Sequence, residues 1–142
     1  MIIDNAQNYR EQVKALLEAE KLPTADLPEN PGNFLVAIVD NKVVGVAGME
    51  VYGNYGLLRS VAVQPDHRGL GIAGKLIGRI ASLGSQKGLS DLYLLTETAP
   101  GYFKNKGFMQ IGREEVPAEI QGSSEFSHVC PVSAIVMKKS IS

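Results

Sequence analysis

Several residue types and patterns that define large classes of protein are scarce in this sequence. Its 142 residues contain one cysteine, Cys130, which excludes an internal disulfide framework and a cysteine-rich zinc site. The net charge is −1, so the chain lacks the broad basic field on which nucleic-acid binding depends. The longest apolar runs, such as residues 34–39, are far shorter than the roughly 20 residues that span a bilayer, and no signal peptide opens the chain. We therefore expect a cytoplasmic protein that binds neither nucleic acid nor membranes.

The remaining composition is that of a globular domain. Hydrophobic residues make up 44% of the chain and charged residues 20%. A chain of this length matches one domain and can bury about two thirds of its unfolded surface. No internal repeat or low-complexity tract interrupts it. We predict a single domain, residues 1–142, without a metal centre.

Hydrophobic periodicity predicts a mixed α/β (α+β) architecture. Strand-like segments lie at residues 1–4, 34–39, 42–52, 57–63, 92–96, 109–112 and 134–138. A helix is predicted over about residues 8–20, with Asn8 as its cap, and a longer one after the glycine-rich turn at residues 68–74. Tight turns join the strands at 34–39, 42–52 and 57–63 into an antiparallel meander. The strand at 92–96 follows a helical crossover, so we expect it to run parallel to the strand at 57–63.

The junction between the strand at 57–63 and the long helix predicts an anion site. A helix start leaves backbone N–H groups without intrahelical partners and carries a partial positive charge. Gly69, Gly71 and Gly74 lack a Cβ, so the backbone can adopt special angles and approach a phosphate closely. We expect the ligand to be a pyrophosphate.

Three kinds of phosphate loop fit this junction to different degrees. A Walker loop ends in Gly-Lys-Ser/Thr, whereas here Gly74-Lys75 precedes Leu76, which has no hydroxyl for magnesium. The Rossmann fingerprint Gly-x-Gly-x-x-Gly matches residues 69–74 as a string. Its acidic ribose ligand would be Asp91, which precedes the next strand where the fingerprint needs an acid at the strand's end. The Rossmann interpretation is therefore less favoured than the third kind of loop.

The third kind resembles the acetyl-CoA loop of the GNAT superfamily of N-acetyltransferases, Gln/Arg-x-x-Gly-x-Gly/Ala, which stands here as Arg68-Gly69-Leu70-Gly71-Ile72-Ala73. The preceding residues 60–65, Ser-Val-Ala-Val-Gln-Pro, look like the family's fourth strand, and Gly107-Phe108 closes its second signature. Segments 22–27, 57–60, 93–96 and 130–134 also resemble the subgroup labelled arsenic-resistance N-acetyltransferase-like.

The resemblance implies the GNAT fold and its cofactor, acetyl-CoA. It implies a mostly antiparallel central sheet that splays between its fourth and fifth strands, and flanking helices. The backbone amides of Val61 and Val63 would hold the thioester carbonyl and pantetheine. The implied cofactor-binding residues are Val61, Ala62, Val63, Arg68, Gly69, Leu70, Gly71, Ile72, Ala73, Gly74, Thr96 and Phe103. Arg68 and Lys75 would add positive charge beside the pyrophosphate. Many members dimerise through their last strands, so the resemblance also implies a homodimer.

Residues 96–108 resemble the second signature, Asn-x-x-Ala-x-x-Phe-Tyr-x-x-x-Gly-Phe, with two departures. Thr96 replaces the asparagine, and its hydroxyl can still donate one hydrogen bond. Phe103 replaces the tyrosine that protonates the leaving CoA thiolate in many members. Tyr102 lies beside it, but adjacent helical residues point about 100° apart. The general acid is therefore unassigned.

The resemblance implies direct attack of an amine on the thioester in a ternary complex, which needs a base. The candidate bases are Glu50 and Glu97, with Glu125 and His128 behind them; each is also explained as a solvated or packed side chain. Arg59 would bind a carboxylate of the acceptor, or be a strand-surface arginine. Tyr52 and Tyr55 would form an aromatic lip over the acceptor, or simply pack the hairpin. Cys130 beside His128 is a less favoured candidate nucleophile.

We therefore predict an acetyl-CoA-dependent N-acetyltransferase acting on a small, amino-acid-like amine. A non-catalytic acyl-CoA-binding sensor or partner module is the alternative from another class, and Phe103 keeps it open. A protein N-terminal acetyltransferase is a third alternative. The residues do not identify the acceptor or any link to arsenic.

Overall fold

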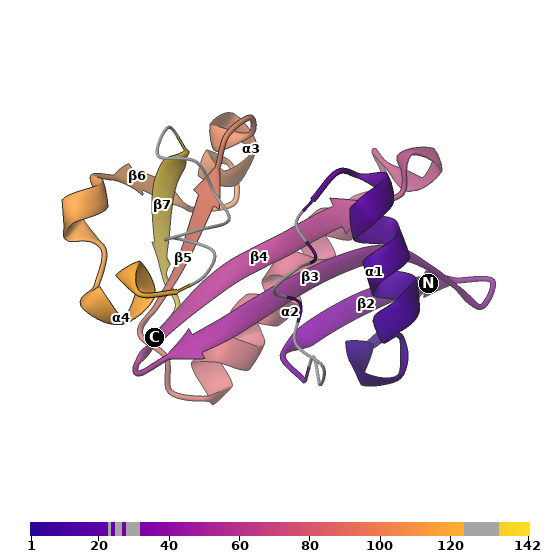
Figure 1. Ribbon diagram of the computed structural model, residues 1–142, viewed down its shortest axis with the longest axis horizontal. Helices are drawn as coiled ribbons and strands as arrows, with labels where there is room; N and C mark the ends of the chain where they lie inside the picture. Colours follow the sequence, from indigo (N-terminus) through magenta and orange to yellow (C-terminus); the bar gives the residue numbers. More distant parts are fainter. Residues whose placement is uncertain (23, 25–26, 28–31, 124–133) are drawn as a thin grey trace. The chain divides into compact units, whose positions relative to one another are not determined.

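The computed structural model describes residues 1–22, 24, 27, 32–123 and 134–142. Figure 1 shows the arrangement of its elements within the chain. In order they are β1 (Ile2–Asn5), η1 (Ala6–Asn8), α1 (Arg10–Ala19), β2 (Phe34–Val39), β3 (Lys42–Tyr52), β4 (Tyr55–Val63), η2 (Pro65–His67), α2 (Ile72–Gln86), β5 (Asp91–Thr96), α3 (Pro100–Lys104), β6 (Met109–Ile111), η3 (Arg113–Glu115), α4 (Ala118–Gln121) and β7 (Ile135–Ser140), where η marks a 3-10 helix. Every predicted strand is present, with ends within two residues of the prediction.

The strands form a seven-stranded sheet in the order β1-β2-β3-β4-β5-β7-β6. β4 and β5 run parallel, whereas β1 with β2, β2 with β3, β5 with β7 and β6 with β7 run antiparallel. The parallel pairing joins Tyr55–Leu57 to Asp91–Tyr93 and ends there, although both strands continue. The predicted fold class, a mostly antiparallel sheet with one parallel pair between its fourth and fifth strands, is confirmed.

The chain folds as two compact units. Unit 1 comprises Met1–Met49 and Ser60–Ile80, and unit 2 comprises Glu50–Arg59 and Ala81–Ser142. Strands β3 and β4 and helix α2 each contribute residues to both units. The glycine-rich loop therefore belongs to unit 1, and the Glu50–Arg59 hairpin belongs to unit 2.

In unit 1, α1 packs on one face of the sheet formed by β1, β2 and β3 (Figure 1). Val36 and Val46 are directly paired across β2 and β3, and both lie in the buried core with the apolar face of α1. That core contains Ala6, Val13, Leu16, Leu17, Leu27, Phe34, Val36, Val46 and Ala62. The helix is stabilised mainly by this burial, since one apolar stripe faces the sheet.

The opposite face of the same strands contacts the first turns of α2. Successive residues of a strand point to opposite faces, so the pair Ala37 and Gly45 faces away from α1. A Cβ built on Gly45 would lie 3.0 Å from Ile72 Cγ2 and 3.2 Å from Leu76 Cδ1. The missing side chain at Gly45 therefore lets α2 approach the sheet closely, which fixes where the helix begins.

The predicted cap of α1 is wrong. Asn8 lies inside the 3-10 helix η1, and α1 begins at Arg10 after Tyr9, which makes no side-chain cap hydrogen bond. The side-chain cap belongs instead to η1, where the side-chain oxygen of Asn5 accepts a hydrogen bond from the N–H of Gln7 at 2.8 Å. The short polar side chain serves the first turn the chain makes after β1, which the periodicity of α1 does not indicate.

In unit 2, β5 pairs with β7 along its whole length, and β7 pairs with β6 on its other side. Leu57, Tyr93 and Val136 form the buried core with Val116 and Ile120. The rings of Tyr55 and Tyr93 meet edge to face with centroids 5.9 Å apart. This packing fixes the β3–β4 hairpin end of the unit, where the candidate acceptor residues lie.

Candidate functional site

The glycine-rich loop of unit 1 exposes its backbone at the start of a 15-residue helix. Gly69 and Gly71 have left-handed φ angles of 81° and 77°, and Gly69, Leu70 and Gly71 are exposed. Other residues adopt these angles at a cost of about 1–2 kcal/mol. Gly74 lies inside α2, so the special backbone angle predicted for all three glycines belongs to the first two. The arrangement suits an anion, because the helix N-terminus offers unpaired N–H groups and a positive dipole end.

The helical end of this loop is anchored in the core. Ile72 is 4% exposed, and Leu76 is fully buried one turn later. Ala73 and Gly74 are half-buried, whereas Leu70 is 64% exposed. The exposed segment is therefore short and held at its helical end by apolar side chains that contact the sheet.

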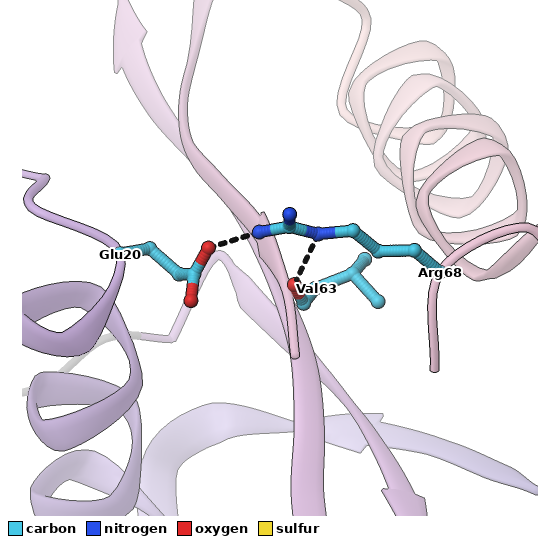
Figure 2. A network of polar contacts seen from close by, with 3 residues as sticks. All are labelled: Glu20, Val63 and Arg68. Carbon is cyan, nitrogen blue, oxygen red and sulfur yellow. Dashed lines mark hydrogen bonds and ion pairs between the residues drawn. The ribbon is translucent and has the colours of Figure 1, made fainter. Parts of the chain in front are cut away.

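The side chain of Arg68 contacts two other residues of unit 1. Its Nε donates a hydrogen bond to the carbonyl oxygen of Val63 at 3.1 Å, and its terminal nitrogen contacts the carboxylate of Glu20, as Figure 2 shows. Glu20 is the residue after α1, and 48 positions separate it from Arg68. Sequence reasoning missed Glu20, because no local spacing pattern reports a contact at that separation.

The predicted thioester segment of β4 contains a backbone irregularity. Ser60 has a φ of 58°, which lies in the left-handed region and is uncommon for a residue other than glycine. A left-handed residue within a strand redirects the N–H groups that follow it. After it, Val61 is half-buried, Ala62 is 6% exposed and Val63 is 8% exposed. Serine gives no sequence signal for this conformation, so the prediction did not include it.

Unit 2 brings together Glu50, Tyr52 and Arg59 from the β3–β4 hairpin. Arg59 Nη1 lies 3.7 Å from Glu50 Oε1, and the Tyr52 hydroxyl donates a hydrogen bond to the same oxygen at 3.2 Å. The Arg59 side chain is 1% exposed, whereas that of Glu50 is 23% exposed. Arg59 is therefore not the strand-surface arginine of the alternative interpretation. Only the carboxylate of this ion pair is open to solvent.

Burial raises the pKa of the Tyr52 hydroxyl to about 12, with further contributions from the negative charge of Glu50 and the hydrogen bond to it. Arg59 and a hydrogen bond with Ser123 oppose this shift. Tyr52 therefore stays protonated near neutral pH and keeps donating to Glu50. Ser123 is 3% exposed and has no sequence signal, so it was missed. Tyr52 and Tyr55 both pack against the unit 2 core, as the packing alternative predicts.

The polar residue of the second signature, Thr96, ends β5 and caps the turn that follows it. The Thr96 hydroxyl oxygen accepts a hydrogen bond from the N–H of Ala99 at 3.1 Å. Phe103 is half-buried and meets the rings of Tyr102 and Phe108 edge to face, with centroids 5.3 and 5.8 Å away. Burial raises the pKa of the Tyr102 hydroxyl, although its side chain remains partly exposed.

The remaining candidate bases and the candidate nucleophile give less information. Glu97 is exposed just after β5. Glu125, His128 and Cys130 lie outside the described residues. In the part of the chain that the structure describes, no three side chains of His, Cys, Asp or Glu gather as metal ligands do. Nor does any helix among those residues combine the length and apolar character needed to cross a membrane.

Comparison with known proteins finds the same family that the sequence of the glycine-rich loop resembles. A family model described as "Acetyltransferase (GNAT) domain" matches residues 30–110, more than half of the chain. The amino-acid acetyltransferase of Pectobacterium carotovorum subsp. carotovorum is 31% identical over 90 residues, which is 62% of this chain and 20% of that enzyme. The chain thus spans about a fifth of the length of this curated relative.

Solved structures agree in fold. Rv2747 from Mycobacterium tuberculosis, crystallised in complex with CoA, superposes with a TM-score of 0.83 at 24% identity and 99% coverage of both chains. N-acetylglutamate synthase from Neisseria gonorrhoeae, complexed with coenzyme A and N-acetyl-glutamate, gives a TM-score of 0.83 at 18% identity, covering all of this chain and 36% of that one.

Proposed function

Because this chain belongs to the GNAT acetyltransferase family, we propose that it transfers the acetyl group of acetyl-CoA to the primary amine of a small, amino-acid-like molecule. The relatives support this substrate class. The curated Pectobacterium relative is named an amino-acid acetyltransferase, and the Neisseria structure holds N-acetyl-glutamate beside coenzyme A. The finer resemblance to the arsenic-resistance-like subgroup, the cytoplasmic location and the homodimer remain predictions.

In this proposal, unit 1 binds the cofactor. The amides of the exposed residues 69–71 and the start of α2 hold the pyrophosphate, as helix N-termini hold phosphate in other proteins. The amides of Val61 and Val63 bind the thioester carbonyl and the pantetheine arm. The left-handed Ser60 precedes these amides directly, which supports a dedicated orientation for them.

The observation that carries the acceptor assignment is the Glu50 carboxylate, partly exposed and fixed from two sides by Tyr52 and Arg59. An oriented carboxylate binds the ammonium group of an amine and then accepts its proton. Arg59 is buried and already contacts Glu50, so it acts on the acceptor through that carboxylate more readily than by binding it. Glu97 is the rival base.

The reaction proceeds in a ternary complex by direct attack. The amine gives up a proton to Glu50, directly or through water, and its nitrogen attacks the thioester carbonyl carbon. The new C–N bond forms, the nitrogen loses its second proton to solvent as the C–S bond breaks, and the CoA sulfur leaves as a thiolate that takes up a proton. Positioning of both reactants supplies much of the rate. Phe103 cannot protonate the thiolate, so solvent or another residue does so.

The assay that tests this function measures CoA thiol release from acetyl-CoA with a panel of free amino acids, and in parallel with short peptides. We expect release with at least one free amino acid and a fall in kcat of at least about tenfold in Glu50→Gln. A fall in Glu97→Gln with Glu50→Gln unaffected would move the base to Glu97. Release with peptides alone would favour a protein N-terminal acetyltransferase.

A second candidate function is a non-catalytic acyl-CoA sensor, which Phe103 at the usual acid position favours. Calorimetric titration with acetyl-CoA separates it from the enzyme. Binding of acetyl-CoA with no thiol release for any amine would establish the sensor. Absence of binding would exclude both functions.

A further inference from the structure

We propose that Glu20 is a positioning residue for the cofactor loop: it holds the guanidinium of Arg68, which in turn holds the last carbonyl of β4 at Val63. The proposal rests on the cofactor role of residues 68–74 proposed above. It assigns Arg68 a structural contact within the loop, whereas the resemblance implies that Arg68 supplies charge to the pyrophosphate. Figure 2 shows the three residues and their two contacts.

The first step concerns the turn between β4 and α2. Arg68 Nε bonds to the Val63 carbonyl at 3.1 Å, five residues back along the chain. The Arg68 N–H also donates to Pro65 O at 3.3 Å, and the N–H of Gln64 donates to Val44 O at 2.7 Å. The side chain of Arg68 therefore closes the turn that leads from the thioester segment into the glycine loop. A shift of that carbonyl would move both groups of amides that the cofactor needs.

The second step concerns what holds Arg68 in place. Its side chain is 56% exposed, and an arginine side chain of this kind loses substantial rotamer entropy when ordered. The guanidinium is a planar fork, so one partner on Nε and another on a terminal nitrogen fix its plane. Glu20 supplies that second partner, and its side chain is 18% exposed. Because the N–H of Glu20 bonds to Leu16 O at 3.1 Å, the carboxylate stands on the anchored end of α1.

The third step is that α1 itself does not favour this carboxylate. Glu20 caps the C-terminal end of α1, where the helix dipole is negative, and the last turn contains no basic residue. A negative charge there is unfavourable for an isolated helix. The contact with Arg68 offsets that cost, which indicates that the residue serves the loop more than the helix.

The two possible roles of Arg68 predict opposite changes in acetyl-CoA affinity when Glu20 is replaced by glutamine. If Arg68 acts as a charge for the pyrophosphate, Glu20 competes for it, and Glu20→Gln should tighten acetyl-CoA binding. If Arg68 acts through Val63 and depends on Glu20 for its orientation, Glu20→Gln should weaken binding. A charge-assisted contact at a partly exposed site corresponds to about a fivefold change in Kd.

The experiment is calorimetric titration of the full chain with acetyl-CoA for wild type, Glu20→Gln, Arg68→Gln and the double variant. We expect Glu20→Gln to raise Kd about fivefold and to leave the number of sites per chain unchanged. A merely less stable protein would show fewer sites at an unchanged Kd. In the Arg68→Gln background, Glu20→Gln should add nothing, because the residue through which it acts is gone.

The matched control is Glu11→Gln, which makes the same chemical change on the same helix. Glu11 contacts Arg10 at 3.6 Å, its side chain is 86% exposed, and it lies in the first turn of α1, at the end opposite Glu20. We expect its Kd for acetyl-CoA to equal that of wild type. A loss of affinity equal to that of Glu20→Gln would show that any charge change on α1 acts alike, and would overturn the proposal.

Other results also overturn it. Tighter or unchanged binding of acetyl-CoA by Glu20→Gln would overturn the proposal. Additive effects of Glu20→Gln and Arg68→Gln on Kd would also overturn it. If Glu20→Gln fails to fold, Arg68→Lys decides, because lysine keeps the charge but cannot hold both partners in one plane. Weakened binding then supports the proposal and wild-type affinity refutes it. If the wild-type protein does not bind acetyl-CoA, the cofactor role of the loop fails, and this proposal fails with it.

Discussion

The guanidinium of Arg59 lies 3.7 Å from the carboxylate of Glu50, and the two side chains differ sharply in exposure, at 1% and 23%. A buried cation beneath a partly exposed anion gives a surface whose accessible charge is negative. Such a surface suits the ammonium group of an acceptor amine. Because Tyr52 donates to the same carboxylate oxygen, the orientation of Glu50 is fixed before any acceptor binds.

Replacing Arg59 by methionine tests whether this ion pair stabilises the fold. The change keeps most of the side-chain volume but leaves Glu50 without its cationic partner. We expect the free energy of unfolding to fall by about 1–3 kcal/mol, the usual loss when a buried or partly buried polar group loses its partner. Urea denaturation measures it. Glu50→Gln in the Arg59→Met background should cost less than Glu50→Gln alone, and equal costs would show that the two residues are not coupled.

The raised pKa of Tyr52 predicts a loss of stability at high pH. In the unfolded chain a tyrosine ionises near pH 10, whereas Tyr52 in the folded protein has a pKa of about 12. Below pH 10 both states are protonated, and between pH 10 and 12 the unfolded state alone gives up its proton. The free energy of unfolding should therefore fall as the pH rises through this window.

Tyr52→Phe should make that fall shallower, as urea denaturation at pH 9 and pH 11 can measure. Part of the slope should persist, since the pKa values of Tyr93 and Tyr102 are also raised by burial. An identical slope in wild type and Tyr52→Phe would contradict the assignment. At neutral pH the variant also lacks the hydrogen bond to Glu50, so its kcat should fall.

Two glycine substitutions separate the loop's conformation from general effects of added bulk. Gly71 has a φ of 77°, so Gly71→Ala strains the loop by about 1 kcal/mol or more, although open space surrounds its Cβ position. Acetyl-CoA affinity should fall several-fold, and Gly71→Glu should abolish binding by adding a negative charge. Gly78 lies inside α2, also with open space around it. Gly78→Ala should raise stability by about 0.5–1 kcal/mol and leave affinity unchanged. Equal losses in Gly71→Ala and Gly78→Ala would show that the loop angle is not required.

The strands and the glycine loop were predictable because their signals are local. Asp40 and Asn41 both adopt left-handed φ angles, 51° and 65°, which is what a tight hairpin turn requires and what these residues tolerate. The ends of β2 and β3 were predicted correctly on either side of that turn. The loop was equally readable, since a strand, glycines and an amphipathic helix follow one another in the chain.

What the sequence did not predict depends on contacts distant in the chain or on conformations that residue type does not indicate. Glu20 meets Arg68 across 48 positions, and Ser123 meets Tyr52 across a longer gap of 71 positions. Ser60 adopts a left-handed angle that a serine in an apolar strand gives no reason to expect. Arg59 could be read as exposed or functional, and only the packing of unit 2 shows that it is buried. Tertiary packing decides these features after the local pattern has set the elements.

Phe103 provides the last test, because a single hydroxyl group distinguishes it from the residue that the second signature expects. Its ring is half-buried and held by edge contacts with Tyr102 and Phe108, so Phe103→Tyr should fold with little change in stability. If departure of the unprotonated thiolate limits the rate, the added hydroxyl should raise kcat for acetyl transfer by up to about tenfold, at the lower end of what general acids supply. Tyr102→Phe is the matched variant one residue away. A fall in kcat there would identify Tyr102 as the acid in use, and an unchanged kcat in Phe103→Tyr would show that protonation of the leaving group does not limit turnover.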